Sequence, residues 1–170
     1  MKSGAYVRCQ TMLHLHSEGF VMGKRVLAVA SAGGHWQQMM LLRDSFSGHQ
    51  TLFLTTLDGL PEQFDAHPAR ILRDCNRNDL VGIVICTLQL SWQLLRFRPD
   101  AVISTGALPG VIALALGRML GAKTIWIDSV ANAEEMSMSG KLAKRFAHHW
   151  LSQWQHVAQA EGAEYAGAVL

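Results

Sequence analysis

Residues 24–42 read KRVLAVASAGGHWQQMMLL, and this stretch decides the fold. Residues 26–30 are apolar throughout, which is typical of a parallel strand buried on both faces. From Trp36 onward the apolar residues recur at helical spacing, so Gly33 and Gly34 lie between the end of a strand and the start of a helix. Free backbone N–H groups and the helix dipole favour an anion at such a turn, and glycine lets a phosphate approach closely. A turn with a purely structural role is the alternative.

The remainder of the chain alternates strand-like and helix-like segments. Short apolar runs predict strands at residues 51–55, 70–73, 101–103, 124–127 and 150–154. Longer segments predict helices at residues 80–97, 111–120 and 140–148. Alternation of this kind is typical of an α/β fold, a Rossmann-like doubly wound parallel sheet.

Two further segments are expected at the ligand-binding edge of that sheet. Ser104-Thr105-Gly106 follows the strand at 101–103 and predicts a second turn able to bind an anion, and Asp128 ends the strand at 124–127. In doubly wound sheets ligands bind outside the carboxyl ends of the strands. We therefore expect both segments to lie near the Gly33-Gly34 turn.

Composition excludes several classes of protein. The 170 residues fit one domain, and with 49% hydrophobic residues they can form an ordinary core. A net charge of +2 without a basic run gives no support to nucleic acid as a partner. Cys9, Cys75 and Cys86 lack metal-ligand or redox spacing, which predicts reduced thiols in a cytosolic protein and no metal site.

Neither the beginning of the chain nor its most apolar helix predicts a membrane span. Residues 1–22 contain no sustained apolar core, so we expect a disordered extension, with translation beginning at Met22. The apolar stretch at 80–95 is shorter than the ~20 residues that a span requires. Its end carries residues suited to a bilayer interface, namely Trp92, Arg96, Phe97 and Arg98. Packing of this helix into the core is the alternative.

Several motifs in a fixed order resemble a known family. They are SAGGH at 31–35, STG at 104–106 with PG at 109–110, WIDS at 126–129, SMSGKL at 137–142 and QW at 153–154. Together they resemble the acceptor-side subunit of the two-chain UDP-N-acetylglucosamine transferase of dolichol-linked oligosaccharide synthesis, whose bacterial relatives serve in exopolysaccharide and capsule biosynthesis. The resemblance covers roughly residues 24–170.

The resemblance implies a fold and a division of labour. Such a chain is similar to the amino-terminal half of a GT-B glycosyltransferase, such as the lipid II-forming enzyme, with residues 23–170 as the acceptor-side domain. A separate partner chain would bind the UDP-sugar in a heterodimer, and the acceptor would be a polyprenyl-diphosphate-linked saccharide. Binding would be peripheral, at the cytoplasmic face of the inner membrane, without metal or other cofactor. Residues 1–23 lack the membrane anchor of eukaryotic members, and Asp128 stands where those members often have glutamate.

Two residues are candidates for the base that takes the acceptor proton. His35 lies at the first glycine turn and histidine can accept a proton near neutral pH, whereas Asp128 ends a strand at the same edge. We favour His35. The alternatives are a loop-fixing hydrogen bond for His35 and a cap of the Ser129 loop for Asp128.

Backbone groups at the two turns are candidates for diphosphate binding. Gly33, Gly34, Thr105 and Gly106 would donate N–H groups to the diphosphate of the donor or of the acceptor. Lys141, at a predicted helix start, would add a cation, with a solvated surface lysine as the alternative.

Two other functions stay open. In a dinucleotide-binding oxidoreductase Asp58 would bind a ribose, but it lies about 25 residues after the glycines instead of the usual ~20, and Gly33-Gly34-His35-Trp36 does not fit G-x-G-x-x-G. The other is a non-catalytic tether that activates a partner transferase. The sequence does not identify the donor or acceptor sugar.

Overall fold

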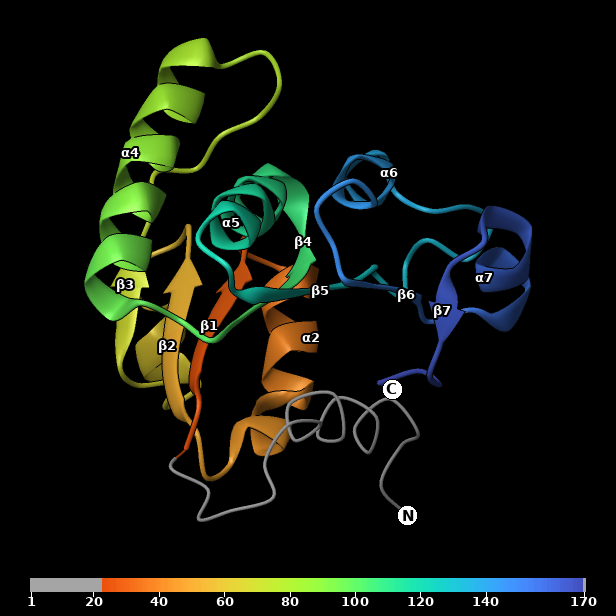
Figure 1. The fold of residues 1–170 in the computed structure, drawn as a ribbon, viewed down its shortest axis with the longest axis horizontal. Coiled ribbons are helices and arrows are strands. Elements are labelled where there is room, and N and C mark those ends of the chain that lie inside the picture. Colours follow the sequence, from red (N-terminus) through yellow and green to blue (C-terminus); the bar gives the residue numbers. More distant parts are fainter. Residues whose placement is uncertain (1–22, 170) are drawn as a thin grey trace.

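The computed structural model describes residues 23–169, which form one parallel sheet flanked by helices (Figure 1). The strand order is β3-β2-β1-β4-β5-β6-β7, and every pairing is parallel. The strands are β1 (Arg25–Ala30), β2 (Gln50–Thr55), β3 (Ala69–Ile71), β4 (Ala101–Gly106), β5 (Lys123–Ile127), β6 (His149–Ser152) and β7 (Glu164–Tyr165). The doubly wound sheet predicted from the sequence is thereby confirmed.

Helices connect the strands. They are α2 (Gly34–Leu41), the 3₁₀ helix η1 (Arg43–Phe46), α3 (Leu60–Gln63), α4 (Leu80–Phe97), α5 (Ala107–Met119), α6 (Met138–Ala143) and α7 (Gln155–Glu161). The predicted bounds of α4 agree with the structure, and its start is capped by Asp79, whose Oδ1 accepts from the Gly82 N–H at 2.8 Å. In Figure 1 the amino-terminal half of α4 stands clear of the other elements.

The core has two layers because β1 is buried on both faces. Leu27 and Val29 belong to one apolar cluster, which includes Cys86, Leu90 and Leu94 of α4 and Ala113 and Leu114 of α5. Val26, Ala28 and Ala30 belong to the other, which includes Trp36 and Met39 of α2. Side chains alternate between the faces of a strand, so a run of five apolar residues can contribute to both layers.

The chain order reverses between β1 and β4, which are neighbours at the centre of the sheet. From β1 the strand order runs one way to β2 and β3 and the other way to β4 and beyond. Crevices at such a switch point, at the carboxyl ends of the strands, are where doubly wound folds bind ligands. His35, in the first turn of α2, and Gly106, the last residue of β4, lie at this edge.

Several predicted bounds differ from the structure. Ser104-Thr105-Gly106 was expected as a turn but completes β4, and α5 begins at Ala107 instead of residue 111. The helix predicted to reach residue 148 ends at Ala143, because β6 begins at His149 and pairs with β5. Helix α7 was not predicted. Residues 1–22, expected as an extension, lie outside the described residues, as does Cys9.

Close packing between α5 and β4 predicts that replacing Gly110 with alanine destabilises the fold. A Cβ atom at Gly110 would overlap the Ser104 side chain, which is fully buried and whose Oγ accepts from the Gly106 N–H at 3.2 Å. We expect Gly110→Ala to lower the free energy of unfolding by about 1–3 kcal/mol, although alanine favours helices more than glycine does. Urea denaturation measures this. Gly34→Ala is the control, since nothing lies within 4 Å of a Cβ there, and an equal loss in both variants would contradict the packing explanation.

Candidate active site

The first turn of α2 places His35 at the switch point. Gly33 precedes the helix with φ at 73°, a left-handed conformation that glycine adopts readily. The turn is fastened to the neighbouring strand, because the Ala32 N–H donates to Thr56 Oγ1 at 3.1 Å. Gly33 and Gly34 are exposed and His35 is half-buried. The helix start is therefore open to a ligand, and its first N–H groups have no acceptor within the helix.

Two hydrogen bonds hold His35 against the end of β4. His35 Nδ1 lies 3.1 Å from the Thr105 carbonyl oxygen, and the Thr105 hydroxyl donates to the His35 carbonyl oxygen at 2.7 Å. A carbonyl oxygen can only accept, so Nδ1 carries the hydrogen. In the neutral ring Nε2 then presents a lone pair, as a general base requires.

Gly106 provides the space for the His35 ring. A Cβ atom at Gly106 would overlap Nδ1 and Cε1 of that ring. Thr105 and Gly106 are both buried, and the Gly106 N–H is taken up by Ser104 Oγ. These two residues thus position His35, which differs from the expectation that they donate to a diphosphate.

Asp128, the other candidate base, lies at the end of β5 and is only 1% exposed. Its carboxylate accepts four hydrogen bonds: from Trp126 Nε1 at 3.0 Å, Asn132 Nδ2 at 3.1 Å, the Ser137 N–H at 2.8 Å and Ser137 Oγ at 2.6 Å. Ser137 in turn caps α6 by accepting from the Gly140 N–H at 2.8 Å. The carboxylate therefore ties Asn132 and Ser137 of the loop at residues 129–137 to the end of β5.

A buried amide pair, which sequence reasoning missed, joins α2 to the far side of the sheet. Gln153 Nε2 donates to Gln38 Oε1 at 2.7 Å and to the Asp128 carbonyl oxygen at 2.8 Å. Gln38 Nε2 donates to Ser129 Oγ at 3.0 Å, and the Val169 N–H donates to Gln153 Oε1 at 3.0 Å. The helix that carries His35 is thus fixed to the Asp128 loop and to the carboxyl-terminal segment. The available signal was Gln38, a polar residue on the apolar face of α2.

Lys141 is engaged in ion pairs away from the switch point. Its Nζ lies 2.7 Å from Glu135 Oε2 and 3.5 Å from Glu161 Oε1. The hydrogen bond with Glu135 raises the pKa of Lys141 and lowers the pKa of Glu135. Lys141 is thus a surface lysine with its charge already compensated, which agrees with the alternative stated for it and not with a diphosphate contact.

Two other kinds of site, metal sites and reactive thiols, can be checked within residues 23–169. Within residues 23–169 no group of three or more His, Cys, Asp or Glu side chains could hold a metal ion. Cys75 and Cys86 are free and buried, and burial raises the pKa of the Cys86 thiol to about 12. A thiol with so high a pKa is unreactive.

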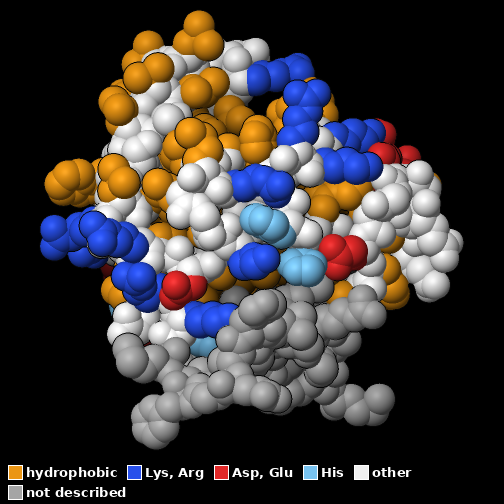
Figure 2. All heavy atoms as spheres, in the orientation of Figure 1, with side chains coloured by type: hydrophobic (Ala, Val, Ile, Leu, Met, Phe, Trp, Pro, Cys, Tyr) orange, Lys and Arg blue, Asp and Glu red, His pale blue; other side chains and the backbone are white. Residues whose placement is uncertain are grey.

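Helix α4 exposes a continuous apolar stripe. The stripe consists of large side chains on one side of the helix: Leu80, Val81, Val84, Leu88, Trp92 and Leu95. Leu80 is 74% exposed and Trp92 64%, whereas Cys86, Leu90 and Leu94 on the opposite side are fully buried. Figure 2 shows hydrophobic side chains gathered over the α4 region, with Lys and Arg side chains beside them. Among the described residues α4 is the one helix long and apolar enough to cross a membrane, yet 22% of it is buried inside the protein.

The predicted membrane residues lie at the carboxyl-terminal end of this stripe. Trp92, Arg96 and Phe97 line one cavity, and Arg98 lines another together with Arg25 and Asp100. Arg98 ends the helix in a left-handed conformation, with φ at 50°. The structure thus brings three of the four residues together.

Comparison with known proteins places the chain in a family. Residues 62–169 match the family described as oligosaccharide biosynthesis protein Alg14 like. The chain belongs to the Alg14-like family. It is 27% identical over 166 residues to the mouse UDP-N-acetylglucosamine transferase subunit ALG14, with 76% of this chain and 75% of the mouse protein covered. The family resemblance inferred from the motifs is thereby confirmed.

Solved structures with a similar fold include MurG and several UDP-N-acetylglucosamine 2-epimerases. Acinetobacter baumannii MurG is 17% identical, with a TM-score of 0.64 over 79% of this chain. The UDP-N-acetylglucosamine 2-epimerase of Rickettsia bellii is 12% identical, with a TM-score of 0.67 over 86% of this chain. The matches cover 43% of the MurG chain and 45% of the epimerase chain, so this chain spans less than half of either. These similarities confirm the Rossmann-like half of a GT-B fold.

Proposed function

We propose that this Alg14-like chain is the acceptor-side subunit of a two-component inverting glycosyltransferase. A partner chain would bind the UDP-sugar, and the sugar would pass to a polyprenyl-diphosphate-linked saccharide in exopolysaccharide or capsule biosynthesis. The observation that carries the proposal is the hydrogen bond from His35 Nδ1 to the Thr105 carbonyl, which leaves Nε2 free at the switch point. Membership of the family, and the transferase-subunit name of the mouse relative, support the assignment.

We infer a second chain because the mouse relative is named as one subunit of a transferase. In the proposed complex the partner supplies the other Rossmann half, and the acceptor lies between the two chains at the carboxyl edge of the sheet. The carboxyl-terminal segment, joined to Gln153 through Val169, is a candidate contact with the partner.

His35 acts as the general base in this proposal. Nε2 accepts the proton of the acceptor hydroxyl while that oxygen attacks the anomeric carbon of the donor sugar, and the bond from that carbon to UDP breaks with inversion. The departing UDP carries the electron pair of the broken bond. Gly33 and Gly34, exposed at the start of α2, donate backbone N–H groups to a diphosphate, which the helix dipole also favours.

Asp128 has a positioning role in the same proposal. Three of its four hydrogen bonds hold the loop at residues 129–137 against the sheet, and the Gln38–Gln153 pair transmits that position to α2. A carboxylate surrounded by four donors and nearly inaccessible to solvent has little opportunity to take a proton from an acceptor.

The exposed apolar stripe of α4 supports a membrane contact in this proposal. Burying large apolar side chains such as Leu88 and Trp92 in lipid contributes about 1.5–3 kcal/mol for each that is fully removed from water. Leu90 and Leu94 on the other side pack into the core, which supports a helix that rests on the bilayer surface over one that crosses it. We place the chain peripherally at the cytoplasmic face of the inner membrane.

Co-purification tests the two-chain proposal. From membranes of the native host in mild detergent, the full chain is expected to bring down a second protein that resembles the UDP-binding half of a GT-B enzyme. That pair should transfer sugar from a UDP-sugar to a polyprenyl-diphosphate acceptor, whereas either chain alone should not. Transfer by the isolated chain would overturn the proposal, and a bound nicotinamide or flavin nucleotide would favour an oxidoreductase instead.

A further inference from the structure

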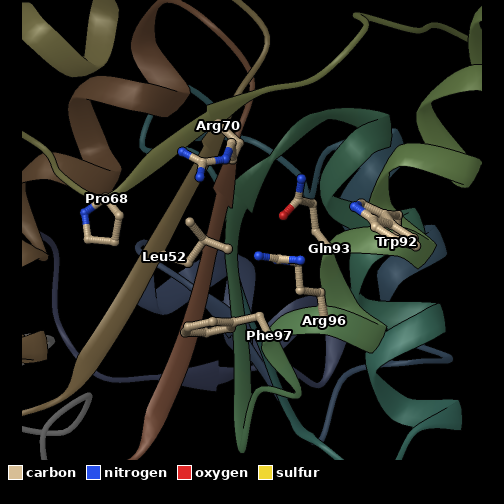
Figure 3. A pocket seen from close by; sticks show the side chains of 7 residues that line it. All are labelled: Leu52, Pro68, Arg70, Trp92, Gln93, Arg96 and Phe97. Carbon is tan, nitrogen blue, oxygen red and sulfur yellow. The ribbon is translucent and has the colours of Figure 1, made fainter.

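A cavity of about 410 Å³ lies between the carboxyl-terminal part of α4 and the edge formed by β2 and β3 (Figure 3). Its lining combines apolar and cationic side chains: Leu52, Pro68, Arg70, Trp92, Gln93, Arg96 and Phe97. In Figure 3 Gln93 and Arg96 project from α4 toward the strands, and Arg70 lies across from them. The cavity is thus formed by segments far apart in the sequence and could not be found from motifs.

The charge of this cavity is uncompensated. No carboxylate is among the lining residues. The ion pairs of lysine and arginine in residues 23–169 involve Arg25, Arg73 and Lys141, and neither Arg70 nor Arg96 takes part. Arg70 donates one hydrogen bond, at 2.7 Å, to the carbonyl oxygen of the adjacent Ala69, which carries no net charge.

Two guanidinium groups on one cavity repel each other unless an anion lies between them. Guanidinium presents a planar fork of donors that matches the oxygens of a phosphate, and the Gln93 amide adds a neutral donor. Leu52 and Phe97 provide apolar surface in the same cavity. The preferred ligand is therefore a phosphate attached to an apolar group.

The cavity continues into the apolar stripe of α4, because Trp92 belongs to both. Tryptophan is enriched at the level of lipid headgroups, where its ring and its N–H find apolar and polar surroundings. A bilayer that covers the stripe would bring headgroup phosphates to Arg70 and Arg96. We propose that this cavity binds the phosphate of an anionic phospholipid headgroup. The inference rests on the proposed contact of α4 with the membrane and adds a specific lipid site to it.

Vesicle binding by the full chain tests the site. The probes are phosphatidylcholine vesicles with and without phosphatidylglycerol, and the wild-type chain is expected to prefer those with phosphatidylglycerol. Arg70→Gln combined with Arg96→Gln should weaken that binding about 25-fold, since each arginine near an anionic surface contributes about fivefold. Arg70→Lys combined with Arg96→Lys should still weaken it about fivefold, because lysine keeps the charge but loses the fork.

Lys123→Gln combined with Arg145→Gln is the matched control. It removes the same two charges from exposed positions that do not line the cavity, and binding should stay within about twofold of wild type. Urea denaturation verifies that each variant is folded.

Several results would overturn the lipid site. Full binding by the double lysine variant would mean general electrostatic attraction, and full binding by the double glutamine variant would mean no role for the cavity. If the double glutamine variant still bound vesicles but no longer co-purified with a second protein, the cavity would be a protein-binding surface. Wild-type chain that binds neither vesicle would refute the α4 membrane contact as well. Failure of the transferase proposal appears separately, as the absence of a partner chain on co-purification.

Discussion

Replacing His35 with asparagine is expected to lower the rate of sugar transfer by the reconstituted two-chain complex by about 10²–10⁴-fold, the usual contribution of a general base. Asparagine can still donate a hydrogen bond toward the Thr105 carbonyl, as His35 Nδ1 does at 3.1 Å, but it has no group at the position of Nε2. The hydrogen bond that holds the side chain is therefore kept, while the group that would accept the proton is removed. Initial rates with a UDP-sugar and a polyprenyl-diphosphate acceptor measure the loss.

Gln37→Ala is the control for His35, because Gln37 is the exposed residue two positions further along α2. Its rate should stay within a few-fold of wild type, and both variants should still bind the partner chain. Unchanged turnover in His35→Asn, together with loss of turnover when the whole chain is omitted, would mean that the chain only tethers and activates its partner.

Replacing Asp128 with alanine is expected to lower the free energy of unfolding by about 3–5 kcal/mol. Four donors would lose their acceptor, and each buried donor left unsatisfied costs about 1–3 kcal/mol, partly relieved by water that enters the space. The loop at residues 129–137 would also come away from the sheet. Urea denaturation of the full chain measures the change.

Two further variants are stability controls for Asp128→Ala. Asn132→Ala removes one of the four donors and should cost about 1 kcal/mol, and Glu135→Gln changes an exposed carboxylate and should leave the free energy of unfolding nearly unchanged. If Asp128→Ala proved as stable as wild type but inactive, Asp128 would be the base in place of His35.

The local pattern of this chain was sufficient to predict its fold class. Residues 26–30 predicted a strand buried on both faces, and the glycines at 33 and 34 predicted the start of a helix where His35 lies. These features depend on neighbours in the chain, namely side-chain alternation, helical spacing and the conformations open to glycine. The bounds at Gly106 and His149 were missed because pairing with β1 and β5 extends or begins those strands.

Side-chain roles depended on contacts that no local pattern reveals. The sequence put His35 and Asp128 at one edge as candidate bases, with His35 favoured. In the structure Asp128 is enclosed by donors from three other residues, whereas Nε2 of His35 has no hydrogen bond within residues 23–169. The sequence made Lys141 a candidate cation, and in the structure its charge is paired with Glu135 and Glu161.

The sequence by itself thus determined the family and the doubly wound sheet, and it predicted the edge where chemistry would occur. Only the tertiary structure decided which polar groups are satisfied and which remain available, as at Arg70 and Arg96, which come from different elements and face one cavity. The physical reason is that burial and hydrogen bonding determine whether a charge can serve a ligand, and both are set by residues distant in the chain.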